Sequence, residues 1–202
     1  MAPDKVRRLQ NRLWATAKQS TGRRFHALYD RIYRSDVLWE AWDRVRANRG
    51  AAGVDHLTIA AVEDDYGVER LLGELQADLR AGSYHPAPVR RVEIPKPDGR
   101  MRPLGIPTVK DRVVQQATKL VLEPIFEADF LPCSFGFRPK RSAHDALQVL
   151  IDESWQGRRW VVETDIASCF ESIPHSELMQ AIEERVCDQA ILSLVRMLLR
   201  AG

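Results

Sequence analysis

Residues 160–173 read WVVETDIASCFESI, an apolar run followed by a single aspartate. Trp160, Val161 and Val162 are large and mostly β-branched, which predicts a buried strand over residues 160–165. Asp165 then lies where this strand ends, a suitable place for a carboxylate that binds a hard cation such as Mg²⁺. Alternatively, Asp165 only caps the turn that follows. Two-metal phosphoryl transfer needs further acidic ligands, and no adjacent pair of aspartates follows Asp165.

A β-hairpin is predicted ahead of the helix expected over residues 108–127. Two short extended runs, 89–94 and 101–106, flank the tripeptide PDG at 97–99, which is a turn signal. Lys96 precedes this turn and Arg102 follows it, so both cations lie on one ribbon. Such a ribbon can cover a triphosphate and neutralise the charge that builds during phosphoryl transfer. Exposed hairpins also carry Lys and Arg for solubility, and the spacing alone favours that simpler interpretation.

Most of the remaining chain has helical periodicity, with apolar residues every three or four positions. Thr108 with Asp111, and Ser142 with Asp145, form capping patterns that open two of the helices. The aromatic stripe of residues 24–47 is interpreted as a packing face rather than as a stacking platform for bases. The predicted helices span residues 4–19, 24–47, 57–62, 68–79, 108–127, 142–155, 175–186 and 188–200.

Residues 135–142, FGFRPKRS, combine three cations and two aromatic rings just before a predicted helix. Backbone N–H groups at a helix N-terminus favour phosphate, and aromatic rings can stack on bases, so the segment suits nucleic-acid contact. The alternative is a loop whose rings fill the core while its arginines pair with nearby acids.

Composition is that of an ordinary globular protein, with 45% hydrophobic and 29% charged residues. The net charge of +2 conceals clusters of arginine, the side chain best suited to phosphate. The cluster in the first quarter of the chain is explained equally well by solvated helix faces. Three scattered cysteines predict neither a disulfide framework nor a zinc site, and a reduced, cytoplasmic setting is expected. The sequence predicts neither a transmembrane helix nor a signal peptide.

The order of these motifs resembles the reverse transcriptases encoded by group II introns, the intron maturases and their bacterial relatives. The blocks that carry the resemblance are RANRGAAGVD (46–55), IPKPDGRMRPLGIP (94–107), DRVVQ (111–115) with LEPIFE (122–127), SFGFRPKRSAHDA (134–146) and DIASCFESIPH (165–175). Each block alone is modest, but five blocks in one order identify the chain as a member of this family.

The resemblance implies a role for each of eleven residues. Asp165, with the backbone carbonyl of Ile166, would bind the catalytic Mg²⁺ ions, and Phe170 would select deoxynucleotides by excluding the ribose 2′-hydroxyl. Lys96 and Arg102 would bind the incoming dNTP. The residues implied to contact nucleic acid are Arg46, Asn48, Gly50 and Gly53 along the template path, and Arg138 and Arg141 at template or primer phosphates or at the joint of fingers and palm.

The implied fold class is α+β: helical N-terminal extension and template-contacting loop (1–56), fingers with a β-hairpin (57–156), and the start of a right-hand polymerase palm (157–202). Such enzymes continue with a Pro-Gln-Gly block and a Tyr-x-Asp-Asp hairpin, which this sequence lacks. We therefore expect a palm truncated before its second catalytic motif, weak or absent Mg²⁺ binding, and no polymerase activity of the chain alone.

Two further hypotheses stay open at this stage. The chain could be a non-catalytic RNA-binding module that uses its basic fingers, or a self-associating remnant of such an enzyme. The partners implied by the family are template or intron RNA, primer DNA and dNTP. A second copy or a complementing palm–thumb polypeptide would cover the incomplete palm, and no membrane partner is expected.

Overall fold

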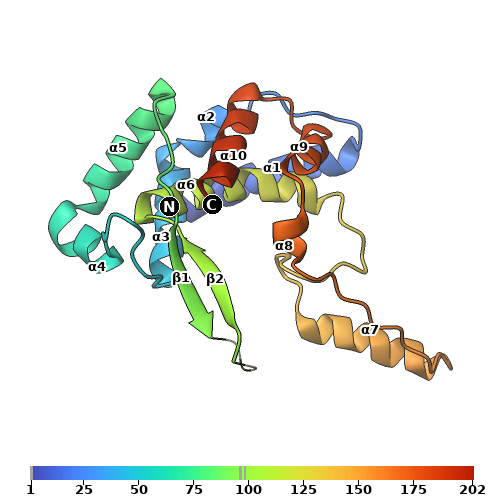
Figure 1. Cartoon of the computed structure of the whole chain (residues 1–202). Helices are drawn as coiled ribbons and strands as arrows, with labels where there is room; N and C mark the ends of the chain where they lie inside the picture. Colours follow the sequence, from blue (N-terminus) through green and yellow to red (C-terminus); the bar gives the residue numbers. More distant parts are fainter. Residues whose placement is uncertain (1, 96, 98) are drawn as a thin grey trace.

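The computed structural model describes residues 2–95, 97 and 99–202, with a long central helix, α6, against which other helices pack (Figure 1). Its elements, in chain order, are α1 (Ala2–Gln19), α2 (Tyr29–Ile32), α3 (Ser35–Ala47), α4 (Ile59–Ala61), a short π-helix (Val62–Tyr66), α5 (Val68–Ala81), β1 (Arg90–Pro95), β2 (Met101–Ile106), α6 (Val109–Glu127), α7 (Ala143–Trp155), α8 (Cys169–Ser172), α9 (His175–Glu183) and α10 (Gln189–Ala201).

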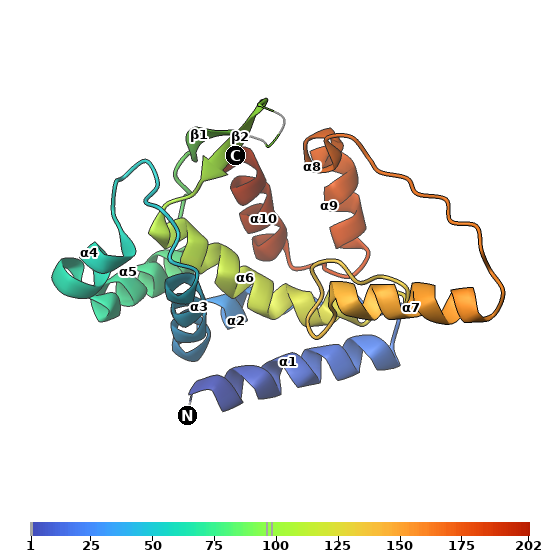
Figure 2. The same ribbon diagram turned by 90° about the horizontal axis from the view of Figure 1, so that it is seen from below.

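Helix α6 provides the centre of the core. Its apolar face, which includes Val113, Leu120 and Ile125, is at most 1% exposed, and α1 and α3 both pack against it (Figure 2). Complete burial of each such side chain contributes about 1.5–3 kcal/mol to stability. Its first turn is capped as predicted, because the Thr108 hydroxyl accepts a 3.1 Å hydrogen bond from the Asp111 amide.

The single helix predicted over residues 24–47 is wrong, because tertiary contacts interrupt it. Phe25 is extended and pairs with the turn before α10, donating its N–H to Arg185 O at 2.8 Å. The Asp188 carboxylate accepts the amides of Leu28 and Tyr29 at 2.8 and 2.9 Å, so a residue distant in sequence caps α2. Most of the apolar stripe still reaches the core, as predicted, although it does so from three separate segments and Trp39 is 37% exposed.

The predicted hairpin is confirmed. Strands β1 and β2 are antiparallel, with Ile94 opposite Arg102, and Gly99 in the turn has a φ of +81° that favours glycine. At its base, the Val89 amide donates to Ala201 O at 3.0 Å, which joins the hairpin to the end of α10. The C-terminal helix therefore helps to set the direction in which the hairpin leaves the core.

The strand predicted over residues 160–165 is also wrong. Trp160 is 96% exposed and Val162 is 89% exposed, and within the described part of the chain only β1 and β2 form a sheet. These two strands pair only with each other, so residues 160–165 have no neighbouring strand to supply hydrogen bonds, and a lone strand is not stable.

Helix α7 has the predicted capping box between Ser142 and Asp145, yet it buries none of its side chains. It projects away from the helical core in Figure 1. The mixture of helices with one small antiparallel sheet agrees with the predicted α+β class. None of the helices in the described ranges is long and apolar enough to cross a membrane.

Candidate nucleotide and nucleic-acid interface

The hairpin presents Arg102 on its return strand, exposed to solvent. Lys96, predicted to act beside it, lies outside the described residues. The ribbon predicted to cover a triphosphate is thus present, with Arg102 accessible to an anion.

The 48–55 loop, predicted to contact template, is held tightly against the start of α6. A Cβ on Gly53 would lie 2.6 Å from the Thr108 Cα, and one on Gly50 would lie 2.2 Å from Arg112 Nη1. The close approach that favours glycine here is therefore an approach to the protein's own backbone and to a guanidinium. Asn48 ends α3 as its C-cap and is exposed, and the Arg46 guanidinium pairs with Glu63 at 2.6 Å.

Other N-terminal arginines are also paired with acids. Arg34 binds Asp36 at 2.6 Å, and Arg44 binds Glu40 at 2.9 Å. Such partly exposed ion pairs contribute at most about 1 kcal/mol each. The simpler interpretation of this cluster, as solvated and paired helix surface, therefore accounts for these two side chains.

Arg138 and Arg141 differ sharply in environment. The Arg138 side chain is 6% exposed, binds Glu127 through Nη2 at 2.6 Å and donates Nη1 to the carbonyls of Leu131 and Ser134. Arg141 is exposed, with its guanidinium 5.4 Å from the centre of the Phe135 ring. Arg138 therefore organises its own loop, while Arg141 is accessible to a phosphate.

Asp165 lies in the irregular segment between α7 and α8, exposed to solvent. Its carboxylate accepts a 2.9 Å hydrogen bond from the Ile166 amide. Phe170 follows in the short helix α8 and is 77% exposed. Among residues 2–95, 97 and 99–202, no group of three or more His, Cys, Asp or Glu side chains is placed to hold a metal ion.

The candidate residues do not all come together, but two of their segments share a side of the molecule. In Figure 2, the hairpin and α8 lie on one side of α6, and α1 lies on the other. Arg102 and Phe170, predicted to contact the same nucleotide, therefore come from segments on the same side.

A buried polar network anchors the approach to the hairpin, and the sequence did not reveal it. The Asp111 carboxylate accepts the hydroxyls of Tyr84 and Thr108, each at 2.6 Å, and the amide of Ala87 at 3.2 Å. Burial, with a further contribution from Asp111, raises the pKa of Tyr84, which stays a neutral donor. Only the Thr108–Asp111 capping pattern pointed to this place.

A second polar cluster, on the surface, joins α5 to α6. The carboxylate of Glu74 accepts the hydroxyl of Tyr66, the ammonium of Lys110 at 3.1 Å and the guanidinium of Arg70 at 3.0 Å. Hydrogen bonds from Tyr66, Lys110 and Arg70, in that order of strength, lower the pKa of Glu74 to about 2. The cluster fixes α5 relative to α6 at neutral pH.

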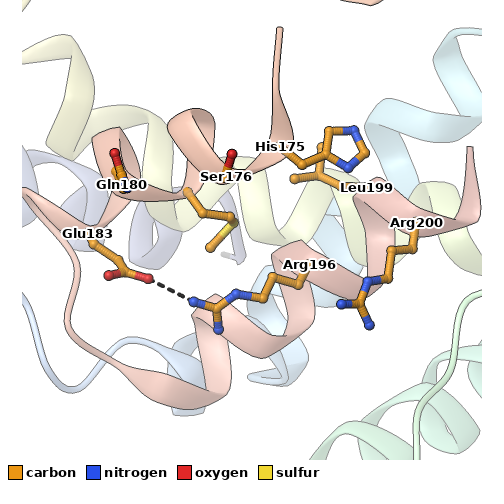
Figure 3. A pocket seen from close by; sticks show the side chains of 8 residues that line it. His175, Ser176, Gln180, Glu183, Arg196, Leu199 and Arg200 are labelled. Carbon is orange, nitrogen blue, oxygen red and sulfur yellow. Dashed lines mark hydrogen bonds and ion pairs between the residues drawn. The ribbon is translucent and has the colours of Figure 1, made fainter.

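A cavity of about 420 Å³ lies between α9 and α10, and none of the predicted site residues lines it (Figure 3). Met179 and Leu199 line it together with His175 and Arg200, and Arg196 pairs with Glu183 at 2.7 Å across it. The Arg196–Glu183 pair is neutral overall, so the charge left over on the lining is the positive charge of Arg200.

Comparison with known proteins gives consistent matches. Residues 94–201 match the family described as reverse transcriptase (RNA-dependent DNA polymerase). The chain is 36% identical to Protein YkfC of Escherichia coli (strain K12) over 203 residues, which cover 98% of this chain and 53% of YkfC. It is 38% identical over 179 residues to the group II intron-encoded protein LtrA of Lactococcus lactis subsp. cremoris, with 88% of this chain and 29% of LtrA covered.

A mitochondrial relative matches over a similar range. The chain is 32% identical to the putative COX1/OXI3 intron 2 protein of Saccharomyces cerevisiae over 168 residues, which cover 82% of this chain and 19% of that protein. The chain thus spans about half the length of YkfC and less than a third of LtrA.

Proposed function

The chain belongs to the reverse transcriptase family of group II intron-encoded proteins and maturases, and we propose that it forms the fingers and first palm segment of such an RNA-dependent DNA polymerase. The match over residues 94–201 carries this proposal, because it spans the turn and return strand of the hairpin, the Arg138 loop and the Asp165 segment. We divide the chain into an N-terminal extension (1–56), fingers (57–156) and the first part of a palm (157–202).

The nucleotide end of the interface consists of the hairpin and α8. Lys96 and Arg102 bind the triphosphate of the dNTP, and Phe170 lies beside its sugar. The exposure of Arg102 and Phe170, on segments at the same side of α6, supports these roles. Asp165, with the carbonyl of Ile166, is the metal-binding position in this arrangement.

The nucleic-acid end consists of the 48–55 loop and the loop before α7. Asn48, Gly50 and Gly53 carry the backbone along which template RNA runs, with Arg46 at its start. Arg141 binds a backbone phosphate, and its exposure over Phe135 supports this role. Arg138 supports the loop from within through Glu127 and keeps only a minor direct contact with nucleic acid.

The described residues do not fit a two-metal centre, because Asp165 is exposed and is not part of any acidic cluster among them. A single carboxylate binds Mg²⁺ weakly and does not fix a second ion. The 202-residue chain alone therefore does not extend a primer. Incubation with an RNA template, a DNA primer, Mg²⁺ and dNTPs tests this, and template-dependent extension products would contradict it.

RNA binding without catalysis is the second candidate function. The exposed Arg102 and Arg141 favour it, because neither needs the metal to bind phosphate. Neutralising RNA phosphates releases counterions, so affinity should be sub-micromolar at low salt and should fall steeply as salt rises. Affinity that is independent of salt would count against this function.

The apolar surface of α7 and residues 160–166 favours association with a second polypeptide. Trp155 is 85% exposed and Trp160 is 96% exposed, and large apolar patches of this kind mark interaction surfaces. The partner is a second copy or a complementing palm–thumb polypeptide. Light scattering of the isolated chain at increasing concentration separates these cases. The measured mass rises only if the chain associates with a second copy of itself.

A further inference from the structure

Two arginines of the fingers hold consecutive carbonyls of the 48–55 loop. Arg112 Nη2, on α6, donates to Ala51 O at 2.7 Å. Arg90 Nε, on β1, donates to Ala52 O at 3.0 Å. Hydrogen bonds from charged donors are stronger than neutral ones, so the two contacts fix the middle of the loop to two different elements.

The loop backbone is shaped to accept the Arg112 guanidinium. Gly50 faces Arg112 Nη1 so closely that a Cβ would lie 2.2 Å from it. Gly53, buried two residues after Ala51, lies against the backbone of Thr108 at the start of α6. The absence of side chains at both glycines thus lets the loop lie against the start of α6, with Gly50 next to Arg112 and Gly53 next to Thr108.

Arg112 holds this position at a cost. Its Nε is buried and has no hydrogen-bond partner among the described residues. Burial lowers the pKa of the guanidinium, although the nearby Asp55 opposes that shift. A buried donor without a partner is unfavourable. The rest of the fingers holds the side chain there, since the neighbouring Asp111 fixes α6 to Tyr84 and Ala87.

We propose that Arg112 is a positioning residue for template binding, and that with Arg90 it couples the 48–55 loop to the hairpin. Arg112 itself does not contact RNA; it holds the backbone that does. Arg90 begins β1, which pairs with the strand that carries Arg102, so the loop and the nucleotide-binding ribbon keep a fixed relation. The inference deepens the proposed function and rests on the loop lying along the template.

The test uses three variants that act on one contact in different ways. Arg112→Gln removes the charged donor, Arg112→Lys keeps the charge but lacks the planar fork, and Gly50→Ala keeps every charge and displaces the guanidinium. Gly73→Ala is the matched control, because a Cβ there meets nothing within 4 Å. Hydrogen–deuterium exchange of peptides over residues 48–58 is measured on each full chain, together with binding of a fluorescein-labelled single-stranded RNA.

Arg112→Gln and Gly50→Ala should each speed exchange in the 48–58 peptides about ten-fold, equivalent to about 1.4 kcal/mol, and leave exchange in α6 unchanged. The same two variants should weaken RNA binding several-fold. Arg112→Lys should also bind the RNA more weakly than the wild-type chain does. Wild-type RNA binding by Arg112→Lys with loop exchange still fast would show direct phosphate contact and overturn the proposal, as would unchanged loop exchange in Arg112→Gln.

The readout separates this inference from the proposed function. If the wild-type chain fails to bind the RNA, the RNA-binding function is wrong, and the inference about template falls with it. If the wild-type chain binds the RNA but Gly50→Ala binds equally well despite faster loop exchange, the function stands and Arg112 has no role in template binding.

Discussion

Replacing Asp111 by alanine should be among the most destabilising single changes in the chain. Asp111 is 3% exposed and accepts three hydrogen bonds, from the hydroxyls of Tyr84 and Thr108 and from the Ala87 amide. Its removal would leave two hydroxyls buried without an acceptor, in residues that are 5% and 4% exposed. Each unsatisfied group costs about 1–3 kcal/mol, so we expect a total loss of about 3–5 kcal/mol.

Urea unfolding followed by circular dichroism measures this loss. With an m value of about 2 kcal/mol/M, the midpoint of Asp111→Ala should fall by about 1.5–2.5 M. The matched control is Asp43→Ala, a change at an exposed carboxylate of α3, which should alter stability by less than about 0.5 kcal/mol. A loss below about 1 kcal/mol in Asp111→Ala would refute the idea that this network anchors the hairpin.

Three further changes test other parts of the structure. The folded-state pKa of Glu74 is about 2, below its ordinary value of 4.5. The stability that ionised Glu74 contributes is therefore full above pH 4.5 and is lost as pH falls toward 2. Glu74→Gln should flatten the fall of Tm across that window. Gly53→Ala should cost about 1–3 kcal/mol in urea unfolding, because its Cβ would collide with the Thr108 backbone. Arg138→Gln should lower the urea midpoint yet change the salt dependence of RNA binding by less than about 0.5 in log–log slope, since Glu127 already neutralises this guanidinium.

Local signals in the sequence predicted local structure well. The Thr108–Asp111 and Ser142–Asp145 patterns gave two helix starts, and the PDG tripeptide gave the hairpin turn, because the atoms that stabilise them lie within a few residues. The irregular stretch before α2 was missed because the carboxylate that caps α2 belongs to Asp188, far along the chain.

The apolar run at residues 160–165 shows the limit of pattern reading. β-branched residues favour a strand only when a neighbouring strand accepts their hydrogen bonds, and the sequence of the run says nothing about that neighbour. The exposure of Trp160 and Val162 is the consequence.

Prediction of the candidate site had the same limit. Gly50 and Gly53 were expected to line the template path, and the structure adds a close approach of each glycine to the chain itself. The partners in this approach, Arg112 and Thr108, could not be foreseen, because they depend on how α6 packs. The roles of Asp165 and Arg102 came from local pattern and from the resemblance, that of Phe170 came from the resemblance alone, and all three stay predictions.

The salt dependence of RNA binding tests most directly the claim that these fingers bind nucleic acid. Affinity of the wild-type chain for a single-stranded RNA is measured by fluorescence anisotropy at several salt concentrations, alongside Arg141→Gln. We predict sub-micromolar binding at low salt, and a log–log slope that Arg141→Gln reduces by about 0.7, the loss of one phosphate contact on single-stranded RNA. Binding that is absent at low salt, or a slope that Arg141→Gln leaves unchanged, would contradict the account.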